Sequence, residues 1–313
     1  MLSRRLIRIK VFKSLFAFEG SGSDSVNASQ KMLLESCEKT RDLYYFLLNI
    51  IPSIVEVARE RIAAGMRKFR PTEAEANPNL KFVENRFAAL LSDDPEFGRI
   101  CRKRGLVWGE WEPFVRHVFN SMVTKEYYQD YMASDTHSFE EDCDLVSCIF
   151  QDEFEDNEEL YSILEDISLL WLDDVDYVLN VIIAAVAEAK RRHRIQHPGI
   201  FMKEDDKEFA LRLHDESILR YDEYFEQMSG HLSNWNSDRL VLTDAALIVM
   251  GITEAVVFPT IPVKVTINEY VEIAKYYSTP NSRIFVNGIL DTIIQEKIRE
   301  GEIVKQGRGL FER

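Results

Sequence analysis

The sequence predicts an all-α protein, and three observations support this prediction. Apolar residues recur at intervals of three and four along most of the 313 residues, as expected of helices that bury one face. No segment alternates apolar and polar residues as a half-buried strand does. No glycine-rich turn of the kind that joins strand to helix in nucleotide-binding α/β folds is present. With 46% apolar content, the chain is able to bury one large core or two modest ones.

The first element is a helix that ends at the polar linker 20–25. Its apolar stripe consists of Ile7, Val11, Leu15 and Phe18. A long periodic region follows from Ser25 to about Phe69, in which Pro52 either kinks the helix or opens a new one. We expect residues 71–78 to form a loop.

The middle of the chain also has helical spacing. Asp94 and Pro95 are typical of a helix cap and first helical position, and residues 105–113 indicate a break before another helix. Apolar spacing continues at Leu160, Ile163, Leu164, Ile167 and Leu170. This segment is therefore expected to fold although it is acidic.

Residues 196–199 mark the clearest boundary, and helices are expected on both sides of it. After it, one long helix runs from about Phe209 through Tyr221 and another spans 235–254. Thr266 and Glu269 fit a capping box, which predicts a helix from Ile267 that turns Ile267, Val271 and Ala274 inward. The last helix is capped by Asn281 or Ser282 and buries Phe285, Ile289 and Ile293.

Gly288 lies in the middle of this last helix, where glycine costs about 1 kcal/mol relative to alanine. We favour the interpretation that Gly288 allows two helices to approach closely. The alternative is that it opens the backbone to a ligand, with Asn287 supplying polar groups beside it.

Charge is distributed unevenly along the chain, whose formal net charge is −15. Residues 126–189, the acidic block, hold 19 of the 53 Asp and Glu residues and none of the 38 Lys and Arg residues. The first 18 residues carry Arg4, Arg5, Arg8, Lys10 and Lys13 and no acid. A compact basic helix on an acidic protein indicates a local site for a polyanion.

The acidic block has three possible interpretations. It mimics nucleic acid and masks the basic helix, it is an interaction surface for basic proteins, or it is a solvated exterior that keeps the molecule soluble.

The carboxy-terminal motifs resemble the NusB family of transcription antitermination factors. The similarity is carried by Val265–Glu269, Glu272–Lys275, Ser282 and Phe285–Asp291, together with the helix at 235–254. The first helix is similar to the arginine-rich amino terminus of that family through Arg4, Arg5, Arg8 and the run Leu15–Glu19.

This resemblance implies a NusB-like bundle of two packed three-helix units, here with an additional helical insert. It implies binding of single-stranded boxA-type RNA together with the small-subunit ribosomal protein NusE, as part of an RNA polymerase antitermination complex. The chain departs from the family in its length, in Asn281 where an acidic residue is frequent, and in Phe16 where tyrosine is frequent.

Two sets of site residues follow. The expected RNA-binding set is Arg4, Arg5, Arg8, Lys10, Lys13, Lys264, Lys275, Arg283 and Asn287, and the expected partner-binding set is Asp238, Asp244, Phe16 and Phe285. Guanidinium groups bind phosphates bidentately and stack on unpaired bases. If about five basic groups each release a counterion, the logarithm of the binding constant falls with the logarithm of salt at a slope of about −3.5. Phe285 is also a candidate core residue.

The expected domains are the first helix at 1–20, the insert at 21–200 and the carboxy-terminal core at 201–313.

The four cysteines lack metal-type spacing and are expected to be reduced thiols. His193 and His197 have the spacing of two metal ligands, but the surrounding arginines oppose a cation. No catalytic motif, cofactor site or membrane-spanning run is found, so we expect a cytoplasmic protein that is not an enzyme. The competing function is a protein-interaction scaffold that has lost RNA recognition.

Overall fold

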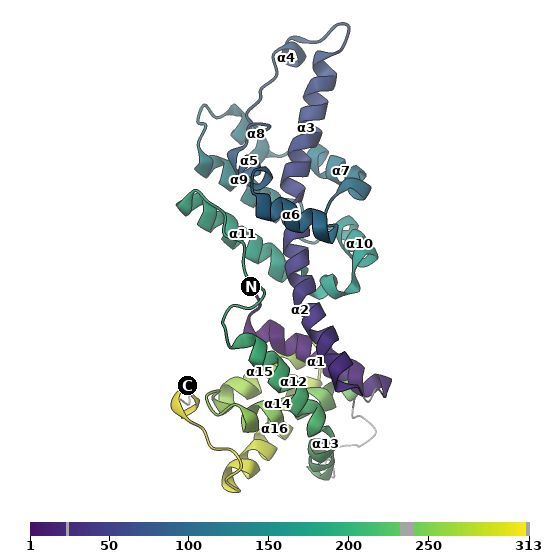
Figure 1. The fold of residues 1–313 in the computed structure, drawn as a ribbon, viewed down its shortest axis with the longest axis vertical. Helices are drawn as coiled ribbons and strands as arrows, with labels where there is room; N and C mark the ends of the chain where they lie inside the picture. The colour runs from purple at the N-terminus through teal and green to yellow at the C-terminus, as the bar shows by residue number, and fades with distance from the viewer. Residues whose placement is uncertain (23–24, 232–240, 311–313) are drawn as a thin grey trace. The chain divides into compact units, whose positions relative to one another are not determined.

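The computed structural model describes residues 1–22, 25–231 and 241–310. The regular secondary structure of these residues is helical apart from one isolated bridge, which confirms the predicted fold class (Figure 1). Their only β pairing is one parallel bridge between Leu2 and Phe201. The chain divides into two compact units. Unit 1 contains Met1 and 38–200, and unit 2 contains 2–37 and 201–313.

Unit 1 begins in the second part of helix α2, which starts in unit 2. Its elements are α2 (Val26–Leu48), α3 (Ile50–Met66), α4 (Glu73–Ala76), α5 (Arg86–Ser92), α6 (Pro95–Arg104), η1 (Gly109–Trp111), α7 (Glu112–Met122), α8 (Glu126–Ala133), α9 (Phe139–Asp152), α10 (Glu158–Ile167), η2 (Leu169–Asp174) and α11 (Val175–Arg192). The aromatic centre of its core is Phe46, whose ring lies 4.2 Å from that of Trp108 and 5.3 Å from that of Trp171.

Local signals placed several of these elements correctly. Pro52 is the third residue of α3, after a break at Asn49, so it opens a new helix. Asp94 Oδ1 accepts hydrogen bonds from the backbone N–H groups of Glu96 and Phe97, at 2.8 and 3.1 Å, with Pro95 at the first helical position. Residues 71–78 are not only a loop, because Thr72 caps the short helix α4.

The acidic block is folded into α8 to α11, as predicted. Leu160, Ile163 and Leu164 are buried, whereas Ile167 and Leu170 have exposed fractions of 37% and 46%. The reason is local: α10 ends at Ile167, and the extended backbone of Ser168 breaks the helical spacing.

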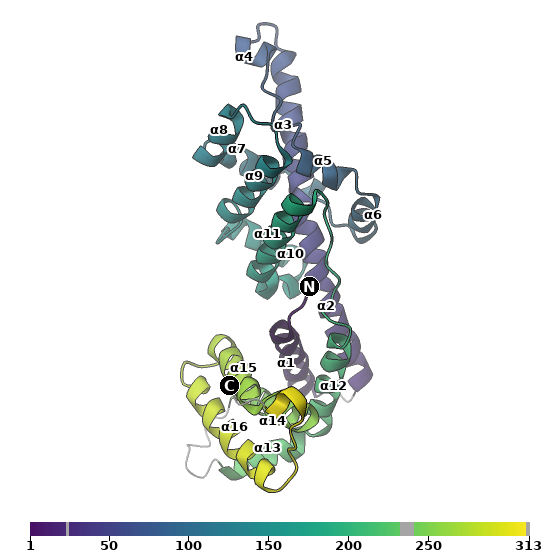
Figure 2. The ribbon, with the colours of Figure 1, turned by 90° about the vertical axis from the view of Figure 1, so that its left-hand side faces the viewer.

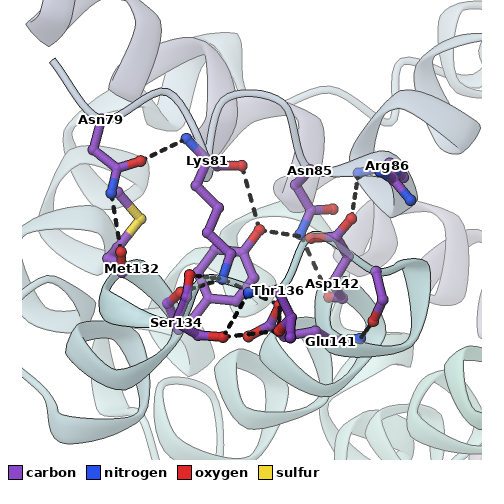
Figure 3. Close-up of polar contacts among 11 residues, drawn as sticks. Asn79, Lys81, Asn85, Arg86, Met132, Ser134, Thr136, Glu141 and Asp142 are labelled. Atoms are coloured by element: carbon purple, nitrogen blue, oxygen red, sulfur yellow. Dashed lines mark hydrogen bonds and ion pairs between the residues drawn. The ribbon is translucent and has the colours of Figure 1, made fainter. Parts of the chain in front are cut away.

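A buried polar cluster fixes the segment between α4 and α5 (Figure 3). Lys81 Nζ donates to the carbonyl oxygens of Tyr131 and Ser134 at 2.5 and 3.1 Å and lies 3.1 Å from Glu141. Asn79 Nδ2 donates to the carbonyl of Met132 at 2.9 Å. These bonds attach an irregular segment to the start of the acidic block and satisfy a buried ammonium group.

Unit 2 packs the first helix against the carboxy-terminal helices. Its elements are α1 (Arg4–Ser21), the first part of α2, α12 (Asp206–Leu219), α13 (Tyr221–Gly230), α14 (Leu242–Val257), α15 (Val263–Tyr277), α16 (Ser282–Arg299) and η5 (Gly307–Leu310). Helices α14, α15 and α16 all contact one another, and α1 and α12 contact α14 (Figure 2). Residues 232–240, which include the first part of the expected helix 235–254, lie outside the described residues.

The beginning of α2 belongs to unit 2, so the two compact units divide at 37/38 along this part of the chain. Ser29 Oγ lies 2.7 Å from His214 Nε2 of α12 and 3.1 Å from Ser14 Oγ of α1. The long helix expected from Phe209 is two helices, α12 and α13, which meet at Arg220.

The predicted capping box at Thr266 and Glu269 is wrong, because α15 begins one turn earlier, at Val263. Thr266 is fully buried, and its hydroxyl donates to Glu254 Oε1 at 2.9 Å instead of capping the helix. Glu269 points to α1, where it pairs with Arg5. Contacts with Glu254 and Arg5 on other helices therefore replace the predicted capping bonds of Thr266 and Glu269.

The close helix approach predicted for Gly288 is also wrong. A Cβ atom added there meets nothing within 4 Å, and the residue is exposed. The close approach occurs at Gly251 of α14, where an added Cβ lies 2.6 Å from Leu290 Cδ2 of α16 and 3.3 Å from Tyr270 Cδ2 of α15.

A buried ion pair holds α1 in unit 2. Arg8 Nε and Nη2 donate to the two carboxylate oxygens of Glu254 at 2.6 and 2.9 Å, and both side chains are almost fully buried. Thr266 and Tyr270 donate to the same carboxylate. Burial opposes the charge of Arg8, but Glu254 outweighs it and raises the pKa of Arg8 above its ordinary value.

We predict that Gly251→Ala destabilises the protein by about 1–3 kcal/mol, because the methyl group overpacks the contact with Leu290. Gly288→Ala is the matched control and should stabilise by about 0.5–1 kcal/mol, since it fills open space in a helix. Urea denaturation followed by circular dichroism measures both. Equal effects of the two substitutions would contradict this assignment of the glycines.

We predict that Arg8→Ala destabilises the protein by about 3–5 kcal/mol, because it leaves Glu254 charged, buried and without its cation. Arg5→Ala removes an exposed pair on the same helix and should change stability by about 0–1 kcal/mol. Thermal denaturation of both variants tests the contrast. A small effect of Arg8→Ala would show that the buried pair does not hold α1.

Candidate nucleic-acid interface

The basic residues of α1 divide into buried and accessible groups. Arg8 and Lys10 have exposed fractions of 3% and 6%, so neither side chain is open to a ligand. Their apolar neighbours explain this, since Ile7, Val11 and Leu15 are buried and bring this face of α1 into the core. The structure therefore does not support direct RNA contacts from Arg8 or Lys10.

Arg4 and Arg5 are accessible but already paired. Arg4 Nη2 lies 2.7 Å from Asp205 Oδ2, and its Nε lies 3.1 Å from Asp206 Oδ1. Arg5 donates to both carboxylate oxygens of Glu269 at 2.8 and 3.0 Å, and 54% of its side chain is exposed. Any polyanion that binds Arg5 must compete with Glu269.

Glu269 links two arginines of α1. Its carboxylate lies 3.5 Å from Arg8 Nη1 in addition to its pair with Arg5. Burial favours the neutral acid, but the hydrogen bond from Arg5 and the charges of Arg8 and Arg5 outweigh it, so the pKa of Glu269 is lowered. The group is therefore an anion at neutral pH, in the place where a phosphate can bind Arg5.

The carboxylates that pair with Arg4, Arg5 and Arg8 are those of Asp205, Asp206, Glu254 and Glu269, all within unit 2.

A strip of accessible basic and aromatic side chains runs where α1 meets α15. We call it the α1–α15 seam and define it by Arg5, Lys13 and Phe16 of α1 with Glu269 and Tyr277 of α15. Lys13 Nζ lies 5.2 Å from the ring centroid of Tyr277, and Phe16 is 38% exposed. The seam provides cations and ring faces together, as single-stranded nucleic acid requires.

Residues near the turn between α15 and α16 extend this surface. Lys275, Arg283 and Asn287 are exposed, as is Lys264 at the other end of α15. The sequence analysis missed Tyr276, which is 73% exposed and whose ring centroid lies 5.4 Å from Lys275 Nζ. The signal was the pair Tyr276-Tyr277 at a helix end, where one ring packs against α1 and the other faces solvent.

The residues predicted to bind a partner differ in their surroundings. Asp244 is 3% exposed and accepts hydrogen bonds from the hydroxyls of Ser278 and Ser282 at 2.5 and 2.8 Å. It therefore fixes the α15–α16 turn and is not placed to contact a partner. Asp238 lies outside the described residues. Phe285 is half-buried, so its side chain is neither core nor a free platform.

His193 and His197 do not form a common site. His193 adopts a left-handed conformation at the end of α11 and lies 3.3 Å from Glu140. His197 packs among the rings of Tyr44, Tyr45 and Phe97, and burial lowers its pKa although Asp94 opposes this effect. The described residues contain no cluster suited to a metal ion. None of the described helices meets the length and hydropathy needed to span a membrane.

Comparison with known proteins identifies a NusB-family match in the carboxy-terminal part of the chain. The model of the NusB family matches residues 200–295, a range that contains most of the carboxy-terminal part of unit 2. The transcription antitermination protein NusB of Salinibacter ruber is 39% identical over 105 residues, which are 34% of this chain and 66% of that protein.

Two further relatives have the same name. The protein of Chloroherpeton thalassium is 37% identical over 106 residues, or 34% of this chain and 50% of its own length. That of Methylacidiphilum infernorum is 44% identical over 75 residues, or 24% of this chain and 52% of its own. The matches thus span about half to two thirds of these relatives. No solved structure matches the chain.

The relatives are named as antitermination proteins and not as enzymes, in agreement with the prediction of a non-enzymatic protein. The motif residues at 265–291, which α15 and most of α16 present, lie in the matched range. Residues 200–295 of this chain therefore form a NusB-family domain.

Proposed function

We propose that the protein is a cytoplasmic transcription antitermination factor that binds single-stranded boxA-type RNA together with the ribosomal protein NusE. The proposal is supported by the NusB-family domain at residues 200–295 and by one feature of the α1–α15 seam, where α1 meets α15 of that domain. Arg5 is half exposed and held by Glu269 in a bidentate geometry that a phosphate also satisfies.

The RNA-binding set is smaller than the sequence indicated. Arg5, Lys13 and Lys275 are the proposed phosphate ligands, and Tyr276 is proposed to stack on a base. Arg4, Lys264, Arg283 and Asn287 remain proposed contacts at the margins. Three phosphate contacts give a salt slope of about −2, in place of the −3.5 expected when Arg8 and Lys10 were included.

For NusE, the proposed contacts are Phe16 and Phe285, because Asp244 is occupied within the domain. A basic ribosomal protein also suits the acidic block by charge. Leu169 and Leu170 in that block are 68% and 46% exposed, which favours its interpretation as an interaction surface. This observation also supports the competing function, a protein scaffold that does not bind RNA.

We predict that Arg5→Glu with Lys13→Glu weakens binding of a boxA-type RNA at least tenfold and makes the salt slope shallower, because two phosphate contacts become repulsive. Fluorescence anisotropy across a salt series measures both quantities. Lys31→Glu, an exposed substitution on α2 with the same change of charge per residue, is the control and should leave the affinity within twofold.

The reciprocal variant is Glu269→Gln, which frees Arg5 and should tighten RNA binding. Unchanged affinity in both Arg5→Glu/Lys13→Glu and Glu269→Gln would contradict the assignment of the seam as the RNA site.

We predict that purified NusE increases the RNA affinity of the chain, and that Phe16→Ala reduces this increase more than it changes binding of RNA alone. Anisotropy with and without NusE provides the comparison. Binding of NusE with no RNA affinity in either condition would favour the scaffold.

A further inference from the structure

A second basic and aromatic element lies in unit 1, at the end of α3. Met66–Arg70, which we call the α3 tip, joins α3 to the loop before α4, and α3 and α4 extend together beyond the other helices of this unit (Figures 1 and 2). Phe69 is 95% exposed and Met66 53% exposed. The aromatic side chain is therefore almost entirely in water.

The tip is strongly cationic. Arg67, Lys68 and Arg70 are all exposed. The guanidinium carbon of Arg70 lies 5.9 Å from the ring centroid of Phe69, so a cation and a ring face lie together. Among the described residues, Arg67 and Arg70 form no ion pair, in contrast to Arg4, Arg5 and Arg8 of α1. Their charges are thus available to an anion without displacing a carboxylate.

The structure holds the tip in place from both sides. Lys68 Nζ donates to Glu75 Oε1 at 2.5 Å, and Thr72 and Glu75 form a capping box on α4. The hydrogen bond from Lys68, with those from Thr72, lowers the pKa of Glu75 to about 2. Gly65 lets α4 pack closely, because a Cβ added there lies 3.3 Å from Glu75 Cγ.

Beyond α4, the chain returns to the body of unit 1 through Asn79 and Lys81, whose bonds attach it to residues 131–141 (Figure 3). The tip is therefore preorganised, with its ends anchored and the side chains of Arg67, Phe69 and Arg70 exposed. Preorganisation lowers the entropy that is lost when a ligand binds.

We propose that the α3 tip is a second binding site for single-stranded RNA, in which a base stacks on Phe69 while Arg67 and Arg70 bind the adjacent phosphates. Stacking of a base on an aromatic side chain contributes about 1–3 kcal/mol. The exposed ring of Phe69 and the guanidinium of Arg70 beside it are complementary to a nucleotide, which has a flat base next to an anionic phosphate. The site goes beyond the α1–α15 seam and does not depend on it.

A membrane surface is the main competing ligand, since phosphate head groups also bind arginine. The tip offers only two apolar side chains, Met66 and Phe69, to the hydrocarbon boundary, whereas interfacial elements present a wide apolar face. RNA is therefore the ligand that we test first, and vesicles serve as the second arm.

The probe is a fluorescein-labelled 12-nucleotide oligouridine RNA, titrated with the full chain. Phe69→Ala should weaken binding about fivefold or more. Arg67→Ala with Arg70→Ala should weaken it and make the salt slope shallower by about 1.4. Arg102→Ala with Lys103→Ala removes two exposed charges from α6 of the same unit and should have less than a twofold effect. Binding by Phe69→Ala within twofold of the unmodified chain overturns the proposal.

Crosslinking with 4-thiouridine in the same RNA separates this site from the seam. Crosslinks at 66–70 that persist in Arg5→Glu/Lys13→Glu support the tip, even if the seam itself fails. Crosslinks at α1 and α15 without any at 66–70 overturn the tip and leave the seam proposal standing. Vesicles of phosphatidylcholine with 30% phosphatidylglycerol form the last arm. Phe69-dependent binding to vesicles without Phe69-dependent binding to RNA also overturns the proposal.

Discussion

The buried pair of Arg8 and Glu254 is the constraint on which unit 2 depends. Neither charge is tolerable in the core alone, and each is offset by the other, while the hydroxyls of Thr266 and Tyr270 also donate to the Glu254 carboxylate. One carboxylate thus fixes α1, α14 and α15 relative to one another. Because Arg5 lies one turn from Arg8 on α1, the same pair determines where Arg5 meets Glu269. A buried structural arginine thereby positions an accessible one.

The accessible Arg5 is paired with a carboxylate that a phosphate can replace. Glu269 keeps the guanidinium of Arg5 oriented and charged, so a phosphate that replaces it finds the fork geometry already formed. The exchange of one anion for another costs less desolvation than would the capture of a phosphate by a core residue. Arg8 has no such freedom, because its carboxylate is enclosed by three donors. The same residue type therefore has two roles on one helix.

Unit 1 separates its charges along the chain. The acidic block at 126–189 carries no Lys or Arg, whereas three basic residues gather at the α3 tip. The block is a set of packed helices with exposed leucines at its α10–η2 junction. Such a unit offers two different kinds of surface, one for basic or apolar partners and one for polyanions, on a scaffold that the NusB family match does not include.

The sequence alone determined the helical class, the family motifs and the local caps, such as Asp94 before Pro95, because periodicity and capping depend on neighbours in the chain. It also predicted the basic first helix. Only the tertiary structure decided which of those side chains reach solvent. Arg8, Lys10 and Asp244 are charged residues in the sequence, but the fold buries all three. Arg8 is bonded to Glu254, which lies 246 residues away in the chain, and Asp244 to Ser278, which lies 34 residues away. The close helix approach predicted at Gly288 lies instead at Gly251, because the distance between helices is a property of packing and not of sequence spacing.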